Sequence, residues 1–240
     1  MLNIQPLTKK AKRVIRKQNL SISSGMHLSD IKPLTDNQSK AFDAWYHDKD
    51  LFLHGCAGTG KTLIAFYLGL REVLLDNVSK VIVVRSVVPS REMGFLPGSA
   101  NEKMKVFELP YFEICSTLFG RGDAYEILKQ RGTIEFITTS HIRGMTFDNA
   151  VVIVDEIQNT CWGEQHTVMS RIGNGTRMII AGDLAQSDLE QHRGKYDVEK
   201  LMVVTKKMDC FEFIDFKPED VVRSGKVRDY IMACNNLGYH

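Results

Sequence analysis

The chain lacks the features that mark disulfide-rich, zinc-binding or membrane-spanning proteins. Its five cysteines are scattered, form no C-x-x-C pair and are odd in number, which argues against a disulfide framework and a zinc site. No apolar run reaches the length of a membrane span, and the first residues lack the apolar segment of a signal peptide. We therefore expect no membrane partner and a reducing, cytoplasmic compartment.

Net charge is also small, because 31 Lys and Arg residues nearly balance 29 Asp and Glu residues, which leaves +2. The distribution is uneven, however, since residues 1–20 contain no acid. Six cations fall in that stretch, namely Lys9, Lys10, Lys12, Arg13, Arg16 and Lys17. Such a stretch is either a flexible solubilising tail or a nucleic-acid contact. We expect residues 1–30 to be a basic, flexible arm and residues 31–240 to form one domain.

Short β-branched runs recur along the chain and alternate with helical or irregular stretches. We expect strands at 51–54, 81–84, 134–137, 151–154, 178–181 and 211–214. The runs are apolar on both faces, as is typical of strands in a covered parallel sheet. Their alternation with helices predicts a three-layer α/β domain with a mostly parallel sheet. A helix is expected from Thr35 to about His47, and the prolines and glycines of 86–110 predict a long loop or insertion.

One stretch carries specific chemistry, and it follows the short apolar strand at 51–53 and precedes a helical pattern. It reads Gly55-Cys56-Ala57-Gly58-Thr59-Gly60-Lys61-Thr62 and fits the phosphate-binding pattern G-x-x-x-x-G-K-[ST]. The glycines let successive backbone N–H groups converge at a helix N-terminus, which attracts anions. Lys61 is expected to reach the β- and γ-phosphates of a nucleotide, and the Thr62 hydroxyl to hold Mg²⁺.

Two acids follow the apolar strand at 151–154, as a Walker B element requires. We expect Asp155 to face the Mg²⁺ shell, through water, and Glu156 to act as general base toward the attacking water. Farther along, Gln186 follows another apolar strand. Its carboxamide is a candidate sensor of the γ-phosphate, and the alternative is a plain turn.

Gln38 has two interpretations. A glutamine carboxamide can pair with N6 and N7 of adenine and so select ATP. The pattern Thr35-x-x-Gln38 is also a capping box that would start the expected helix. Both roles are compatible.

Several of these motifs together resemble the ATPase cores of superfamily 1 helicases, and more specifically the PhoH family. The supporting stretches are Asp155-Glu156-Ile157-Gln158, Gly182–Leu189, Val84-Arg85, Gly94–Gly98, His141–Phe147, Arg171-Ile172-Gly173 and Asp220–Arg223. The match runs from about residue 34 to 231. The chain departs from the family at Met145, where an arginine is typical, which puts one phosphate or nucleic-acid contact in doubt.

The resemblance implies a single RecA-like P-loop ATPase domain over residues 31–240. It also implies ATP hydrolysis and a link to RNA or single-stranded nucleic acid, as in a helicase-like motor or remodeller. The compact size and short arm are similar to phage-encoded members, for which the compartment would be the host cytoplasm. The sequence does not decide between RNA and DNA.

Phosphoryl transfer usually needs an arginine on the developing charge. Residues 187–240 are too few for a second RecA-like domain, so we expect the arginine to come from this domain or from a neighbouring subunit. Arg223 matches the family's Val-Val-Arg, and we expect it to act in trans within a homo-oligomer such as a hexameric ring. The alternative is a surface salt bridge.

Arg85, with Ser86, is a candidate contact to a nucleic-acid backbone. Arg143 lies at the same expected edge of the sheet. Both arginines could equally pair with carboxylates.

Two other function classes compete with the ATPase. A small-molecule P-loop kinase usually lacks the paired Asp-Glu and carries an arginine-rich lid, which is not found here. A GTP-dependent binding switch needs Asn-Lys-x-Asp, and Thr205–Asp209 has no Asn in the right place. Nucleotide preference and transfer of phosphate to an acceptor distinguish these classes.

Overall fold

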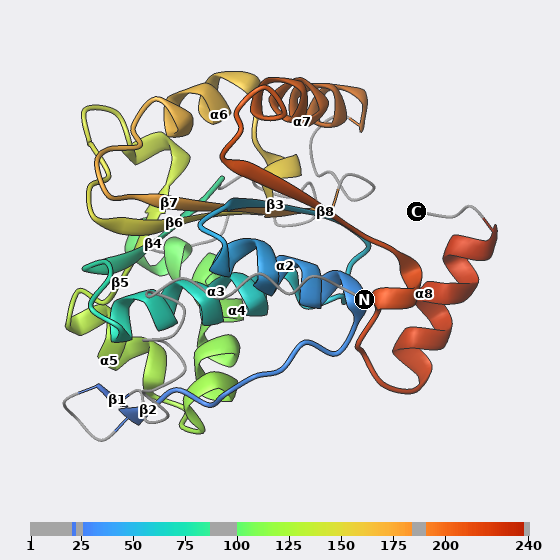
Figure 1. Cartoon of the computed structure of the whole chain (residues 1–240), viewed down its shortest axis with the longest axis horizontal. Coiled ribbons are helices and arrows are strands. Elements are labelled where there is room, and N and C mark those ends of the chain that lie inside the picture. Colours follow the sequence, from blue (N-terminus) through green and yellow to red (C-terminus); the bar gives the residue numbers. More distant parts are fainter. Residues whose placement is uncertain (1–20, 23–25, 87–99, 184–190, 238–240) are drawn as a thin grey trace, which may run out of the picture.

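The main sheet carries the fold, and all of its strands run parallel. The computed structural model describes residues 21–22, 26–86, 100–183 and 191–237. The strands of this sheet are β3 (Asp50–Gly55), β4 (Lys80–Arg85), β5 (Ile134–Thr138), β6 (Ala150–Asp155), β7 (Arg177–Gly182) and β8 (Phe211–Phe216). Their order in the six-stranded sheet is β5-β4-β6-β7-β3-β8 (Figure 1). The predicted strands and the α/β class are confirmed.

Helices cover both faces of the sheet. They are α2 (Asp36–Tyr46), α3 (Lys61–Leu74), α4 (Ala100–Phe119), α5 (Ala124–Gln130), α6 (Trp162–Met169), α7 (Gln191–Thr205) and α8 (Lys226–Leu237). Figure 1 shows α6 and α7 on one face and α2 to α5 on the other, with α8 at the side. Each face of the sheet has its own apolar cluster, and alternate apolar residues of β6 belong to one cluster or the other. All six residues of β6 are buried. This is why the strands read as continuous apolar runs.

The packed domain begins before residue 31. A small antiparallel pair joins β1 (Ser21–Ile22) to β2 (Met26–His27). Met26 is 1% exposed and belongs to the apolar cluster that includes the buried residues of α3. The Ser29 N–H donates to the Leu118 carbonyl at 2.7 Å, and the Tyr67 hydroxyl donates to Asp30 at 2.8 Å. The last residues of the predicted arm therefore belong to the domain, while residues 1–20 lie outside the described part.

The stretch 86–110, expected to be a loop or insertion, includes the first half of a helix. Helix α4 begins at Ala100 and continues through Pro110, and residues 87–99 lie outside the described part. Tyr111, Cys115 and Leu118 recur at helical spacing and are each 0% exposed. Burial of this stripe outweighs the local cost of the proline, since tertiary packing regularly overrides propensity.

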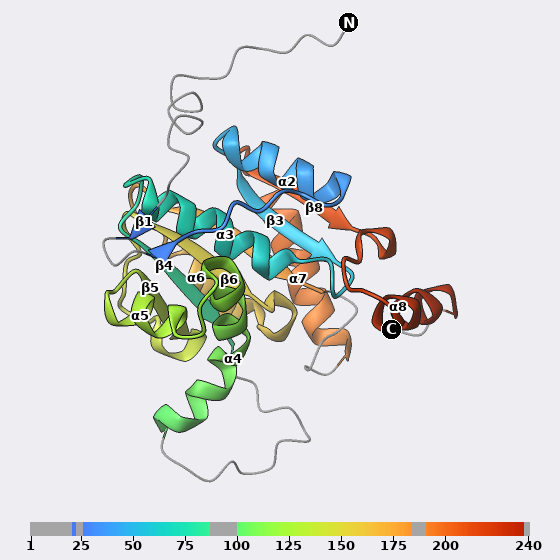
Figure 2. The ribbon, with the colours of Figure 1, turned by 90° about the horizontal axis from the view of Figure 1, so that it is seen from below.

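The parallel sheet places the carboxyl ends of all its strands at one edge, where ligands bind in open α/β folds. The loop after β3 leads into α3 at this edge (Figure 2). Two short 3-10 helices, η2 (Ile157–Asn159) and η3 (Pro218–Asp220), follow β6 and β8 there. In the described ranges, no helix combines the length and apolarity that crossing a membrane requires.

Candidate active site

The loop from Gly55 to Thr62 has a backbone that only glycine adopts readily. Gly55, Gly58 and Gly60 have φ values of 113°, 75° and 84°, a region that disfavours side chains with a Cβ. At Gly55 an added Cβ would also overlap the Phe216 carbonyl of the neighbouring strand. The glycines of the motif are therefore needed both for the turn and for the close approach of β8.

Lys61 begins α3 and folds back over the loop. Its ammonium donates to the carbonyls of Gly55 at 2.8 Å and Cys56 at 2.6 Å. Burial lowers the pKa of Lys61, and the nearby carboxylates of Asp183 and Glu156 oppose that shift. The lysine thus sits where it can exchange loop carbonyls for phosphate oxygens, which a cation in an anion-binding loop would do.

Thr62 and Asp155 meet as the motifs predict. The Thr62 hydroxyl donates to Asp155 Oδ1 at 3.0 Å, and the Tyr111 hydroxyl donates to Asp155 Oδ2 at 3.0 Å. Burial raises the pKa of Asp155 to about 6, with Glu156 adding to the shift, while Arg85 and the two hydroxyl donors lower it. Burial likewise raises the pKa of Tyr111 well above its usual range, so this hydroxyl stays a donor.

These oxygens fit Mg²⁺ better than a metal that needs a full protein cage. Across the residues that the structure describes, no group of three or more His, Cys, Asp or Glu side chains could hold a metal ion. Mg²⁺ keeps several waters and usually takes only one or two protein oxygens together with phosphates. Thr62 and Asp155, side by side at the loop, supply such a pair.

Glu156 lies beside this pair in a strained backbone conformation. Its φ is 53°, which costs a non-glycine residue free energy and is common at functional sites. The Gln158 carboxamide donates to the Glu156 carboxylate and accepts the Asp183 backbone N–H at 3.0 Å. Gln158 therefore joins the Walker B acid to the end of β7, across Gly182.

Gln38 contacts the phosphate-binding loop directly. It is 5% exposed, and its Nε2 donates to the Thr59 carbonyl at 2.9 Å. The capping interaction of Thr35 is present, because its hydroxyl accepts the Gln38 N–H at 3.3 Å. Gln38 Oε1 accepts the Leu34 N–H at 2.8 Å rather than that of Thr35. Contact with adenine stays a prediction.

Arg223 is exposed and lies against the loop of its own chain. Its Cγ is 3.1 Å from the place where a Cβ on Gly58 would be, and the neighbouring Val222 N–H donates to the Gly58 carbonyl at 3.1 Å. Arg223 and the loop are far apart in sequence but close in space, because β8 pairs with β3 and Phe216 lies opposite Gly55.

The remaining predicted residues are Gln186, Ser86, Arg85 and Arg143, and of these only Arg85 lies at the cleft in the described part of the chain. Gln186 lies outside the described residues. The Ser86 hydroxyl donates to Glu164 at 3.2 Å, so it has a partner within the protein. Arg85 faces the cleft, where its pKa is lowered by burial but raised on balance by Tyr111, Asp155 and Glu156, whereas Arg143 is exposed.

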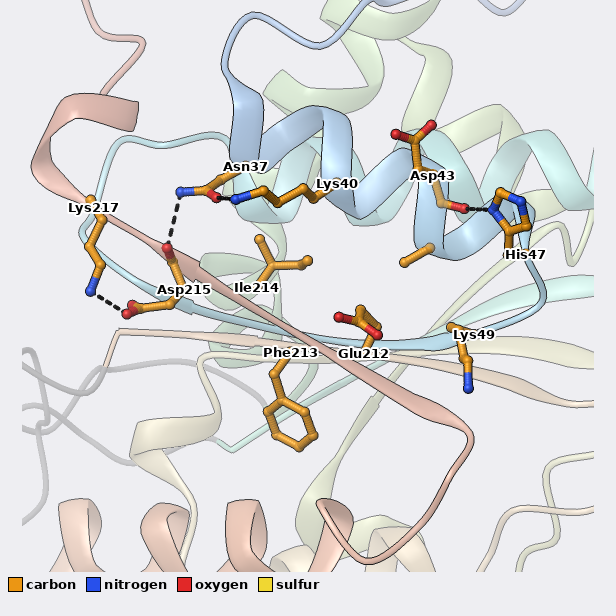
Figure 3. A pocket seen from close by; sticks show the side chains of 11 residues that line it. Asn37, Lys40, Asp43, His47, Lys49, Glu212, Phe213, Ile214, Asp215 and Lys217 are labelled. Atoms are coloured by element: carbon orange, nitrogen blue, oxygen red, sulfur yellow. Dashed lines mark hydrogen bonds and ion pairs between the residues drawn. The ribbon is translucent and has the colours of Figure 1, made fainter. Parts of the chain in front are cut away.

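Most of the predicted site residues, but not Gln38, line a cleft of about 460 Å³. The cleft gathers the loop, both Walker B acids, Arg85 and Arg223, and one wall of α4 that includes Pro110 and Glu113. A larger hollow of about 800 Å³ lies between α2 and β8 and contains none of the loop. Figure 3 shows it lined by charges of both signs, with Asn37 bonded to the Asp215 carbonyl across the seam. Lys61, Thr62 and both acids after β6 line the smaller cleft and not the larger hollow.

Sequence reasoning missed the roles of Tyr111, Gln158 and Gly182. Gln158 appears in the Asp-Glu-Ile-Gln stretch, but nothing local indicates that it bridges to Asp183. Tyr111 belongs to no recognised motif, and no role was predicted for it. The helical spacing of Tyr111, Cys115 and Leu118 is the signal that could have indicated a buried face.

Known proteins match most of the chain. A protein-family profile described as PhoH-like protein matches residues 30–235. A PhoH-like protein of Bacillus subtilis is 34% identical over 208 residues, which cover 85% of this chain and 63% of the relative. One from Synechocystis is 34% identical over 183 residues, covering 76% of this chain and 55% of the relative. The chain thus spans less than two thirds of either protein.

Solved structures match at lower similarity. The large terminase of a thermophilic bacteriophage superposes with a TM-score of 0.47 at 14% identity, covering 83% of this chain and 49% of the terminase. Bacteroides Pif1 bound to single-stranded DNA gives a TM-score of 0.40 at 12% identity, covering 87% of this chain and 46% of that protein.

Proposed function

This chain belongs to the PhoH-like family of nucleotide-binding P-loop proteins, and we propose that it is an Mg²⁺-dependent ATP hydrolase. One observation carries the proposal. Lys61, Thr62, Asp155 and Glu156 come from two distant stretches of sequence and line one cleft at the carboxyl edge of the sheet. That is the arrangement that hydrolysis of a β–γ phosphoanhydride needs.

Each of these residues has a place in the reaction. Lys61 binds the β- and γ-phosphate oxygens, and Thr62 with Asp155 would hold Mg²⁺. When bound there, the metal would neutralise part of the negative charge of the phosphates. Glu156 accepts a proton from water as the water oxygen bonds to the γ-phosphorus. The bond from that phosphorus to the bridging oxygen then breaks, which releases ADP and phosphate. Gln158 supports this role because it fixes the Glu156 carboxylate.

Arg223 is the proposed charge stabiliser, and the contact with Gly58 favours action within its own chain. Its backbone neighbour, Val222, is bonded to the same loop, so the guanidinium starts at the rim of the cleft. A finger in trans from a ring of subunits, expected from the sequence, is the alternative. Gln38 and Gln186 remain proposed contacts to adenine and to the γ-phosphate.

We further propose that single-stranded nucleic acid, RNA or DNA, couples to hydrolysis in a helicase-like or remodelling activity. Support comes from the six cations of residues 1–20 and from the family resemblance. A small-molecule kinase or a nucleotide-dependent switch are the alternatives. Phosphate release without an acceptor, and its stimulation by RNA or single-stranded DNA, would distinguish these classes.

The test replaces the carboxylate of the proposed base by a carboxamide of nearly the same size and shape. Glu156→Gln is expected to bind ATP as the wild type does and to lose turnover by a factor of about 10² or more. Lys61→Ala should weaken ATP binding as well. Glu126→Gln makes the same substitution at an exposed acid of α5 that does not line the cleft and is the control, with turnover near wild type. Near-normal turnover in Glu156→Gln would exclude Glu156 as the base.

A further inference from the structure

The Tyr111 hydroxyl is the one group from α4 that hydrogen-bonds a Walker B acid, among the bonds that the structure describes. The tyrosine is 0% exposed, and its hydroxyl lies 3.0 Å from Asp155 Oδ2. Thr62 holds the other oxygen, also at 3.0 Å. The carboxylate is therefore clamped from both sides, which fixes its rotation and leaves Oδ1 turned toward the phosphate-binding loop.

The clamp is rigid because the tyrosine ring has no room to move. It stacks on Phe66 of α3, with centroids 5.0 Å apart and planes at 21°. Phe136 and Tyr125 lie at centroid distances of 5.9 and 6.5 Å on its other sides. Arg85 lies close enough to the Tyr111 hydroxyl to lower its pKa and oppose the effect of burial. A side chain locked by packing and placed on a helix holds a site more firmly than one on a loop.

Tyr111 also connects the metal pair to the wall of the cleft. Its helix neighbours Pro110 and Glu113 line that cleft beside the loop. Tyr111 itself is buried, and its hydroxyl reaches Asp155, which lines the same cleft. A movement of this part of α4 would therefore move the clamp on Asp155.

We propose that Tyr111 is a positioning residue for Mg²⁺, whose hydroxyl orients Asp155 beside Thr62 so that the two oxygens can hold the metal. This rests on the proposed function. Without the hydroxyl, Asp155 Oδ2 is a buried oxygen short of a donor, and the carboxylate is free to turn toward Arg85. Residues that orient a metal ligand typically change metal affinity by tenfold or more when they are removed.

The experiment compares Tyr111→Phe with Tyr125→Phe. Both variants remove one buried tyrosine hydroxyl and keep the ring. The Tyr125 hydroxyl donates to Glu108 at 2.6 Å and not to the metal pair, which makes it the matched control. The readout is binding of a fluorescent ATP analogue as Mg²⁺ is titrated, with a parallel titration in EDTA and a thermal unfolding midpoint for each variant.

Tyr111→Phe is expected to raise the Mg²⁺ concentration for half-maximal binding about tenfold, the size of one lost hydrogen bond to a charged group. Its affinity for the analogue in EDTA should stay that of the wild type. Tyr125→Phe should lower the unfolding midpoint without moving the Mg²⁺ dependence. Three results would overturn the proposal. They are an unchanged Mg²⁺ dependence in Tyr111→Phe, an equal shift of the Mg²⁺ dependence in both variants, and analogue binding by the wild type that does not depend on Mg²⁺.

The outcome is separable from that of the proposed function. If Glu156→Gln keeps its turnover while Tyr111→Phe shifts the Mg²⁺ dependence, the assignment of the base fails and the positioning role stands. If Glu156→Gln loses turnover while Tyr111→Phe leaves the Mg²⁺ dependence unchanged, the proposed hydrolysis stands and only the positioning role of Tyr111 is rejected.

Discussion

Gly182 is the position at which one added methyl group tests the link between the Walker B acid and strand β7. A Cβ there would lie 2.6 Å from Ile157 Cγ2 and 3.1 Å from the Ile157 backbone nitrogen, with Gln158 Oε1 closer still. The backbone atom cannot rotate away, so η2 must shift. We expect Gly182→Ala to cost about 2 kcal/mol of folding free energy from overpacking.

The displaced Gln158 carboxamide adds to that cost and carries the functional effect. Its bonds to Glu156 and to the Asp183 N–H are each worth about 1 kcal/mol, so the total loss approaches about 4 kcal/mol. Urea unfolding should show a lower midpoint with an unchanged slope. Turnover should fall more than ATP affinity, because Glu156 loses its partner while Lys61 keeps its place.

Gly163→Ala is the control for this substitution. The nearest atom to a Cβ at Gly163 is the Cys161 sulfur at 4.0 Å, and the residue lies within α6. Alanine in a helix is up to about 1 kcal/mol more favourable than glycine, so stability should hold or rise. Wild-type stability and turnover in Gly182→Ala would refute the close packing of η2 on β7 and the role given to Gln158.

Two further predictions concern subunits and partners. If Arg223 acts within its own chain, a mixture of Lys61→Ala and Arg223→Ala proteins stays inactive, whereas recovery of turnover in mixed oligomers would establish a finger in trans. Deleting residues 1–20 removes six cations and should make the log–log salt dependence of single-strand binding shallower by up to about 4; an unchanged slope would leave the arm as a solubilising tail.

The parts of the fold that the sequence predicts are those fixed by local patterns. The run 151–154 is confirmed as β6, because a strand buried on both faces needs apolar residues at every position. The phosphate-binding loop is predictable for a similar reason, because its glycines take the positive φ values that the turn needs within a few residues. The helix at 36–46 follows from its cap at Thr35.

The parts that were missed depend on contacts between distant segments. The clamp of Tyr111 on Asp155 joins α4 to β6, and no local pattern in either segment marks it. The start of α4 at Ala100 was hidden because Pro110 reads as a helix breaker. Strain at Glu156 is likewise invisible, since the sequence does not show that a glutamate takes a left-handed backbone.

The position of Arg223 shows why strand order matters for the choice between action in cis and in trans. Since β8 lies parallel to β3, both strands deliver the chain to the same edge, one into the phosphate-binding loop and the other into the segment that carries Arg223. The Val222 N–H then holds that segment to Gly58. An arginine from a neighbouring subunit would have to enter a rim that this chain's own Arg223 already lines. A shared site would therefore either bring a second arginine beside this chain's own Arg223, or need the segment after η3 to leave the loop and break the bond between Val222 and Gly58.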